Sequence, residues 1–335
     1  MFVLESYPWA VVFCIITMLC WGSWANTQKL AKKGWRFELF YWDYTIGVLL
    51  LTLILGLTLG SNGSAGRPFV EDLRQASQSG IFSALLGGAI FNAANILLVA
   101  AIDIAGMAVA FPVGIGLALV LGVVVNYREN PVGDAMLLFS GVALVTLAII
   151  LDAIAYRKIP GGSAGGVSTK GLLLSIACGL LMGFFYRFVA ASMYPNFTQP
   201  EPGKMGPYAA VFVFAVGIFL SNFILNTIVM KKPFVGQPVA FSDYFKGDFR
   251  THLTGILGGI IWGVGMSFNI IASGRAGFAI SYGLGQGATM VAAFWGVFIW
   301  KEFRTAPAGT SKLIGAMFAC FLAGIVLIIY ARVRA

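Results

Sequence analysis

Polar and aromatic side chains interrupt the apolar stretches of this chain where a small solute could be bound. Residues 21–28 read Trp-Gly-Ser-Trp-Ala-Asn-Thr-Gln, and Asn92 and Asn95 lie three apart, which places both on one face of a helix. A polar group among apolar neighbours is costly unless it has a partner. Such groups therefore mark either hydrogen bonds between helices or the path of a solute. The candidate solute-binding residues are Trp21, Trp24, Asn92, Asn95, Arg187, Asn269, Tyr282 and Gln286.

Each residue type suits a different contact with a solute. An asparagine or glutamine amide both donates and accepts a hydrogen bond, and the planar fork of Arg187 can bind a carbonyl, hydroxyl or carboxylate oxygen. The ring of Trp21 or Trp24 can stack on a sugar or a heterocycle. Each contact has a structural alternative: the amides can join helices, Arg187 can reach the headgroup region, and the tryptophans can pack.

Two aspartates within apolar stretches are candidates for carrying a proton. Asp43 follows Phe-Tyr-Trp, and Asp152 lies near the end of another apolar stretch. A carrier driven by protons needs a group that titrates as the carrier cycles, and a buried carboxyl group can serve. Capping of a helix end is the structural alternative for both. We expect Asp43 to be the first candidate and Asp152 the second.

The sequence lacks the motifs that would indicate a metalloprotease, a nucleotide-binding loop or a cysteine-based metal site. There is one histidine, His252, and neither HExxH nor a Walker loop occurs. The four cysteines form no CxxC pair. We therefore expect no enzymatic activity, no cofactor and no bound metal.

The composition requires a lipid environment for much of the chain. Hydrophobic residues make up 59% of it, charged residues only 10%, and the mean hydropathy is +0.87. A spanning helix needs about 20 mostly apolar residues. Ten such stretches predict an all-α membrane protein, at residues 8–28, 38–60, 79–102, 105–126, 133–156, 170–192, 206–230, 251–272, 276–299 and 309–332.

The net charge of +9 comes from basic residues in short loops, so it does not indicate nucleic-acid binding. Loops after odd-numbered spans carry about twice as many Lys and Arg residues as the termini and the other loops. The bias predicts that the odd loops face the cytoplasm. Both termini would then lie outside, and we expect the protein in the plasma, or inner, membrane.

The second half of the chain repeats features of the first. Gly106, Gly114 and Gly116 recur after a constant interval as Gly277, Gly285 and Gly287, and the pair Arg128-Glu129 resembles Lys301-Glu302. Halves with an odd number of spans have opposite orientations, as in many transporters. We expect a first five-helix repeat at 1–157, a cytoplasmic linker at 158–169, and a second repeat at 170–335.

The repeats also predict where helices loosen. The glycines of Gly283-Leu-Gly285-Gln-Gly287 favour an irregular ninth span, and Pro112 stands at the matching place in the fourth. Unwound backbone of this kind often lines a solute site near the bilayer midplane. We expect the third and fourth spans, and the eighth and ninth, to form hairpins that rock around that site.

The layout resembles the drug/metabolite transporter superfamily, and the opening is similar to the ureide permease family. The similar residues are Leu4-Glu5-Ser6, Gly22-Ser-Trp24, Tyr41-Trp42-Asp43-Tyr44, Asn95 with Gly106, Asn126-Tyr127 and Gly141-Val142. Bacterial glucose/ribose and rhamnose carriers resemble it by the same layout. The resemblance implies a permease with outward termini, mostly proton-coupled, for allantoin, nucleobases or sugars. By position it strengthens Asp43, Trp24 and Asn95 as functional residues.

Together these features predict a secondary transporter that imports a small polar solute, a sugar or a ureide/nucleobase, with protons. Its partners would be that solute, protons and the lipid bilayer, and it would be a monomer or homodimer. Two alternatives remain at this point. An exporter of lipophilic compounds would have an aromatic, carboxylate-bearing cavity with few amides. A channel or a membrane-embedded interaction protein would not show saturable transport.

Overall fold

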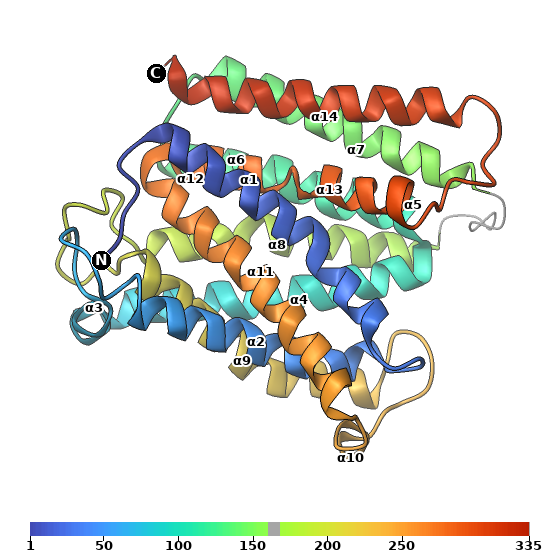
Figure 1. Cartoon of the computed structure of the whole chain (residues 1–335), viewed down its shortest axis with the longest axis horizontal. Coiled ribbons are helices and arrows are strands. Elements are labelled where there is room, and N and C mark those ends of the chain that lie inside the picture. The colour runs from blue at the N-terminus through green and yellow to red at the C-terminus, as the bar shows by residue number, and fades with distance from the viewer. Residues whose placement is uncertain (160–167, 335) are drawn as a thin grey trace. The chain divides into compact units, whose positions relative to one another are not determined.

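The computed structural model describes residues 1–159 and 168–334, and all regular elements in these ranges are helical (Figure 1). Ten helical segments are long and apolar enough to cross a membrane. The predicted all-α class and its ten spans are therefore confirmed. The elements are α1 (Tyr7–Ser23), η1 (Trp24–Leu30), α2 (Phe37–Leu57), α3 (Phe69–Gln75), α4 (Gln78–Ala105), α5 (Met107–Ala110), η2 (Phe111–Ile115), α6 (Gly116–Glu129), α7 (Ala135–Arg157), α8 (Thr169–Ala191), α9 (Pro207–Lys231), α10 (Phe241–Tyr244), α11 (Phe249–Ala276), α12 (Phe278–Gly285), α13 (Ala288–Phe294), η3 (Trp295–Ile299) and α14 (Thr310–Val333).

Both predicted irregularities are present. The ninth span is interrupted at Gln286 and Gly287, between the end of α12 and the start of α13. In the fourth span, Pro112 lies in a π-helical turn, η2. Pro112 has no N–H to continue a regular α-helix. The predicted linker, with its Gly161–Gly166 run, falls mainly on residues 160–167, which lie outside the described residues.

Two glycines that match between the sequence halves adopt the same backbone conformation. Gly106 has φ 75° and ψ 164°, and Gly277 has φ 85° and ψ 152°. This region is essentially restricted to glycine. Each glycine follows a helix of 28 residues and precedes a short helix. The similarity of the halves therefore extends to local structure, while their inverted orientation stays a prediction.

The helices form two compact units that each draw on both sequence halves. Unit 1 comprises residues 1–92 and 185–275, and unit 2 comprises 93–184 and 276–335, of which 160–167 and 335 are not described. The boundaries fall inside α4 and α8, so each of these helices contributes to both units. The units therefore differ from the predicted repeats, which rest on sequence similarity rather than on compactness.

Unit 1 depends on close contact between α2 and α11. Gly255, Gly259 and Gly263 are spaced by four along α11 and form one stripe, which faces α2. A methyl group on Gly255 would collide with the side chain of Asp43, and one on Gly259 with the backbone of Tyr44. Small residues at this spacing let helix backbones approach closely, and in lipid such packing contributes much of the association. On another face, α2 lies beside α9 (Figure 1).

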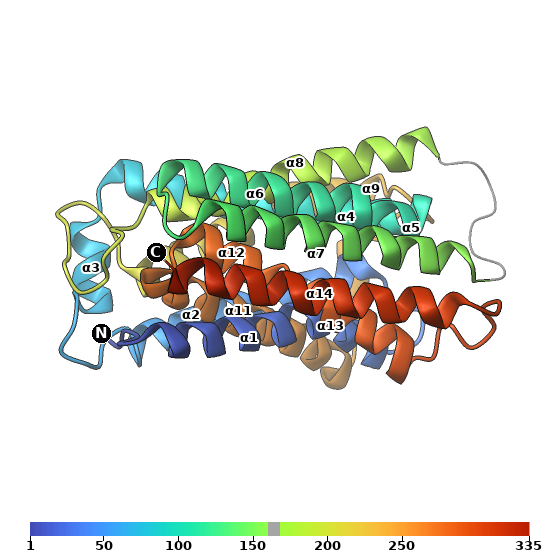
Figure 2. The same cartoon turned by 90° about the horizontal axis from the view of Figure 1, so that it is seen from above.

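Unit 2 is organised around the antiparallel pair α7 and α14, which lie side by side in both views (Figures 1 and 2). Gly141 and Gly324 form the contact reciprocally. A methyl group on Gly141 would lie 2.7 Å from the Gly324 carbonyl oxygen, and one on Gly324 2.8 Å from the Gly141 oxygen. The two backbones therefore meet directly at this point.

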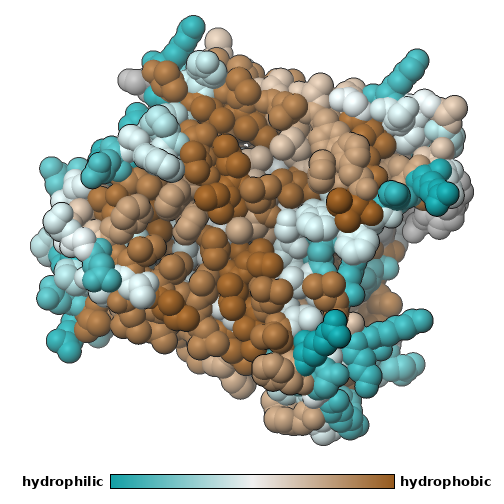
Figure 3. All heavy atoms as spheres, in the orientation of Figure 1, coloured by the Kyte–Doolittle hydropathy of each residue, from teal (hydrophilic) through white to brown (hydrophobic). Residues whose placement is uncertain are grey.

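Large apolar side chains remain exposed along the outer faces of the spans. In unit 1, Trp9 and Leu19 of α1 and Leu253 and Leu257 of α11 are exposed. Figure 3 shows apolar side chains over the middle of both helices and hydrophilic ones near the loops. An apolar belt of this kind suits contact with acyl chains.

We predict that Gly259→Ala separates α2 from α11 and destabilises the protein by about 1–3 kcal/mol, the usual cost of overpacking. Gly315→Ala is the matched control, because α14 offers open space around Gly315. That change should stabilise by about 0.5–1 kcal/mol through reduced backbone entropy. Thermal unfolding in detergent, followed by tryptophan fluorescence, measures both. Equal behaviour of the two variants would contradict the glycine contact.

Candidate functional site

A group of aromatic rings surrounds Trp262 in unit 1. The Trp262 ring lies 4.4 Å from that of Phe91, 5.9 Å from Trp21, 6.1 Å from Phe214 and 6.3 Å from Tyr44, measured between centroids. The Trp21 and Trp262 rings are nearly parallel, with 13° between their planes. The rings come from α1, α2, α4, α9 and α11, so five helices meet at this indole. We call these five residues the Trp262 group.

Two hydrogen-bond donors in the Trp262 group have no partner among the described residues. They are the indole N–H of Trp21 and the hydroxyl of Tyr44, and both atoms are buried. Nearly all buried polar atoms in proteins have a partner, so unpaired ones call for an explanation. Tyr44 is also enclosed by Trp24 at 4.7 Å and Tyr41 at 5.1 Å. The group is therefore apolar in its ring faces and has unused donors at two edges.

Local structure explains why Trp21 is held there. It lies in the last turn of α1, before the chain tightens into the 3₁₀ helix η1 at Trp24. The edge of its indole rests on the bare α-carbon of Gly265, where a methyl group would lie 2.8 Å from Nε1. The Thr17 hydroxyl donates a hydrogen bond of 2.9 Å to the Gly265 carbonyl oxygen. The indole N–H thus meets carbon rather than an acceptor.

A second feature of unit 1 is a buried carboxylate with two titratable partners. Asp43 Oδ1 accepts a hydrogen bond of 2.6 Å from the hydroxyl of Tyr244, and Asp43 Oδ2 lies 2.8 Å from Nδ1 of His252. Asp43 comes from α2, Tyr244 from α10 and His252 from the first turn of α11. The His252 ring also packs edge-on against Trp35 at 5.6 Å. We call Asp43, Tyr244 and His252 the Asp43 cluster.

The Asp43 cluster can hold one proton at either of two atoms. A neutral His252 protonated at Nδ1 donates to the carboxylate, and a protonated Asp43 donates to the imidazole instead. The Asp43 side chain is 2% exposed and that of His252 is 20% exposed. The imidazole therefore lies between the buried carboxyl group and solvent. Burial and the neighbouring carboxylate raise the pKa of Tyr244 above its usual value, so its hydroxyl remains a donor.

Another buried carboxylate of unit 1, Asp72, has a permanent cationic partner. Arg67 Nη1 donates to Asp72 Oδ1 at 2.9 Å, and the backbone N–H of Gly206 donates to Oδ2 at 2.5 Å. Burial raises the pKa of Asp72, while the Gly206 N–H and Arg67 act in the opposite direction. These bonds join the loop before α3 to the loop before α9. Asp72 is thus a structural tie, because an arginine does not give up its proton.

The other predicted residues of unit 1 lie in different surroundings. The amide of Asn92 donates to the Ser221 hydroxyl at 2.9 Å and to the Ile218 carbonyl at 3.3 Å, which joins α4 to α9. Asn269 of α11 is fully buried. Arg187 is exposed, close to the end of α8. The amide nitrogen of Asn92 therefore makes hydrogen bonds between helices, as the structural alternative for the amides predicts. The Oδ1 atom of Asn92 has no partner among the described residues.

The predicted residues of unit 2 are Asn95, Tyr282, Gln286 and Asp152. Tyr282 packs against Gly122, and its hydroxyl lies 3.2 Å from the Ala118 carbonyl oxygen and 3.1 Å from that of Met182. Its donor is therefore used within the unit. Asn95 is buried, and Gln286 is buried at the break after α12. Convergence of these residues with those of unit 1 stays a prediction.

Asp152 is buried beside another acidic group of unit 2. The hydroxyl of Tyr156, one turn further along α7, donates to Oε2 of Glu302 at 2.8 Å. Oδ1 of Asp152 has no hydrogen-bond partner among the described residues. Asp152 thus lacks the paired donors that define the Asp43 cluster.

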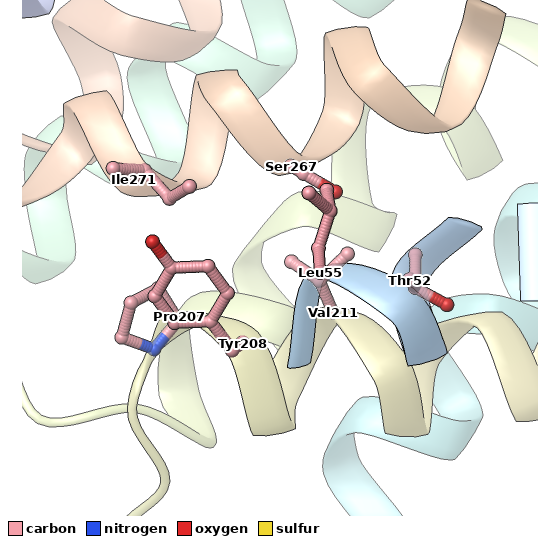
Figure 4. A pocket seen from close by; sticks show the side chains of 7 residues that line it. All are labelled: Thr52, Leu55, Pro207, Tyr208, Val211, Ser267 and Ile271. Carbon is pink, nitrogen blue, oxygen red and sulfur yellow. The ribbon is translucent and has the colours of Figure 1, made fainter. Parts of the chain in front are cut away.

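A recess in unit 1 lies between α2, α9 and α11 (Figure 4). Its lining residues are Thr52, Leu55, Pro207, Tyr208, Val211, Ser267 and Ile271. The recess leaves no room for a water molecule, and the hydroxyl of Tyr208 donates to the Phe2 carbonyl at 3.1 Å. It is therefore a packing defect rather than a solute site in this conformation.

Sequence reasoning missed several members of these groups. His252 stands out in the sequence only as the single histidine, and Tyr244 lies between two of the apolar stretches. Their partner Asp43 is more than 200 residues away in sequence, so no local spacing connects them. The one available signal was the presence of a lone histidine at the start of a span. Within residues 1–159 and 168–334, no three His, Cys, Asp or Glu side chains gather as metal ligands would.

Comparisons with known proteins agree with the fold. Residues 40–159 and 164–331 match the ureide permease family. Ureide permease 2 of Arabidopsis thaliana is 23% identical over 97% of this chain and 97% of its own length. Ureide permease 1 of the same plant is 22% identical over 97% of each chain. Transmembrane protein 144 homolog B of Dictyostelium discoideum is 25% identical over 40% of this chain and 34% of its own length.

One solved crystal structure matches 97% of this chain and 98% of its own chain, with a TM-score of 0.60 and 15% identity, which shows a shared fold. The family match covers most of the described helices, including those that carry the Asp43 cluster and most of the Trp262 group. The two Arabidopsis relatives are named permeases, that is, transporters rather than enzymes. Ten apolar helices and these relatives make the protein an integral membrane protein. The chain belongs to the ureide permease family.

Proposed function

We propose that this protein is a secondary transporter that imports a small polar solute together with protons, by alternating access. The observation that carries the proposal is the Asp43 cluster, a buried carboxyl group held by Tyr244 and His252 within a permease fold. The names of the relatives favour a ureide as the solute. Nucleobases and sugars are further candidates. The sugar candidates follow from the layout shared with bacterial glucose/ribose and rhamnose carriers of the drug/metabolite transporter superfamily.

The Asp43 cluster has the chemistry that coupling to protons needs. A carboxylate in an apolar surrounding is costly unless it is paired, so gain of a proton changes its preferred surroundings. His252 is partly exposed and can pass a proton between solvent and Asp43. Neither partner is a fixed cation, in contrast to Arg67 beside Asp72. Charge at Asp43 can therefore appear and disappear as the protein cycles. Asp152 in unit 2 is the second candidate for this role.

The solute-binding residues proposed for this function remain Trp21, Trp24, Asn92, Asn95, Arg187, Asn269, Tyr282 and Gln286. The contact of Trp21 with Trp262 and that of Trp24 with Tyr44 support the assignment of these two tryptophans most directly. We further propose that the two sequence halves have inverted orientations in the plasma, or inner, membrane, with both termini outside. The distribution of basic residues supports this sidedness.

Asp43→Asn should abolish uptake driven by a pH gradient, because an amide of the same shape cannot take up and release a proton. We expect the initial rate of gradient-driven uptake into proteoliposomes to fall at least about 100-fold, in the range typical of a lost proton-transfer group. Allantoin, uracil and glucose are the solutes to test. Solute exchange across vesicles without a gradient should persist, because it needs no net proton transfer.

Glu71→Gln is the matched control, since Glu71 is an exposed carboxylate in α3. Its gradient-driven uptake should equal that of the unmodified protein. Asp43→Asn that retains full gradient-driven accumulation would rule out the assigned role of Asp43. If the gradient accelerates uptake of no solute in the unmodified protein, coupling to protons is wrong.

Tyr244→Phe should shift the pH dependence of transport to higher pH. The hydroxyl of Tyr244 donates to Asp43 and stabilises its charged form, so loss of that donor makes protonation easier. A hydrogen bond to a charged group contributes about 1.5–3 kcal/mol, which corresponds to about one pH unit or more. Initial rates across a pH series measure the shift. An unchanged profile with a lowered maximum would indicate that Tyr244 only supports the fold.

A further inference from the structure

We propose that the Trp262 group binds a flat ring that carries carbonyl oxygens, with the indole N–H of Trp21 and the hydroxyl of Tyr44 as its hydrogen-bond donors. This inference rests on the transport function proposed above and assigns the residues that would recognise its solute. It assigns the recognition to five residues of unit 1, of which only Trp21 is among the solute-binding residues predicted from the sequence.

The two unpaired donors are the first argument. Burial of a donor without an acceptor is unfavourable, and the fold offers none to Trp21 Nε1 or the Tyr44 hydroxyl within the described residues. Both rings lie against the same indole, that of Trp262, at 5.9 and 6.3 Å. A ligand with two acceptor atoms would satisfy both donors at one place. A bound molecule is one of the partners that can satisfy a buried donor left unpaired by the fold.

The ring faces are the second argument. The Trp21 and Trp262 planes differ by only 13°, which presents two nearly parallel aromatic faces to each other. A flat ring stacked on both needs a contact of about 3.5 Å on each side, or about 7 Å between the flanking rings. Their centroids are 5.9 Å apart, so the pair is closed here and has to open by at least about 1 Å.

The position of Trp21 allows that opening. The chain changes from α1 to the 3₁₀ helix η1 at Trp24, one turn after Trp21, and a change of this kind within a span often marks a hinge. The indole rests on the bare α-carbon of Gly265, so no side chain at that position blocks its rotation. Rotation away from Gly265 would turn the N–H from carbon toward an acceptor on a ligand.

The chemistry of the group favours a carbonyl-bearing heterocycle over a sugar. The indole N–H can only donate, and the phenol hydroxyl is left as a donor too, which matches carbonyl oxygens. The Trp262 group contains no carboxylate or amide to receive the many hydroxyl protons of a sugar. Its flat, apolar faces suit a ring without axial substituents. Imide and ureido rings have both properties.

Binding to the purified protein in detergent tests the proposal without any gradient. Hydantoin and uracil serve as flat carbonyl-bearing probes and glucose as the non-planar probe, each followed as a concentration-dependent rise in the unfolding temperature. We expect hydantoin or uracil to stabilise the protein and glucose not to. Tyr44→Phe keeps the ring and removes one donor, and Trp21→Phe keeps a smaller aromatic ring and removes the other donor. Each variant should raise the dissociation constant of the flat probes about tenfold, the effect of one lost hydrogen bond to a ligand.

The unliganded proteins provide a second readout. Because the Tyr44 hydroxyl has no partner in the described structure, Tyr44→Phe should unfold at the same temperature as the unmodified protein or higher. Tyr194→Phe removes another buried tyrosine hydroxyl, which lies outside the Trp262 group and packs on Phe197. Its affinity for the probes should be unchanged.

Three results would overturn the proposal: stabilisation by glucose alone, no stabilisation by hydantoin or uracil up to their solubility limits, or unchanged probe affinity in both Trp21→Phe and Tyr44→Phe. Failure of coupling to protons would instead leave this binding intact, since no gradient is present. A flat-ring ligand that binds through both donors but is not moved by a pH gradient would support the proposed site and contradict the proposed coupling.

Discussion

The close contact between α2 and α11 is the constraint on which both the Asp43 cluster and the Trp262 group depend. Lipid tails are as apolar as the protein interior, so burying an apolar side chain between membrane helices gains little free energy. Helix association therefore relies on tight packing. Gly255 and Gly259 bring α11 onto α2 at two consecutive residues, Asp43 and Tyr44. Consecutive residues of a helix point about 100° apart. One therefore enters the Asp43 cluster and the other the Trp262 group, and a single glycine stripe positions both.

In the proposed mechanism, the titratable groups lie apart from the residues that recognise the solute. The Trp262 group presents aromatic faces and two neutral donors, whereas the titratable side chains gather around Asp43. A neutral solute gains most from stacking and from a few well-placed hydrogen bonds, and an ionised group beside it would add a desolvation cost. A proton, by contrast, needs a carboxyl group that tolerates both charge states. The proposed arrangement would give the solute and the proton the surroundings that the chemistry of each favours.

Composition predicted the spans well, because the length of a membrane helix is set by the bilayer and the apolar stretches are long. The break after α12 was also predictable, since glycine and proline act locally on the backbone. The partners of Asp43 were not, because Tyr244 and His252 meet it only through packing of α10 and α11. Tyr282 shows a further limit: its residue type marked it as a candidate for solute binding, but only the packing shows that backbone carbonyls of α6 and α8 lie within hydrogen-bond distance of its hydroxyl.

The adjacency of Asp43 and Tyr44 gives the proposed transport a physical route for coupling. Any rearrangement of α2 that moves Tyr44 relative to Trp262 also moves Asp43 relative to Gly255 and His252, because the helix is rigid over one residue. Linkage then requires reciprocity: if a bound solute changes the proton affinity of Asp43, a proton on Asp43 changes the solute affinity by the same factor. Coupling between the two sites therefore needs no long pathway, only a contact between α2 and α11 with two packed arrangements. The glycine stripe favours such a contact, because few side chains would have to repack when α2 and α11 change from one arrangement to the other.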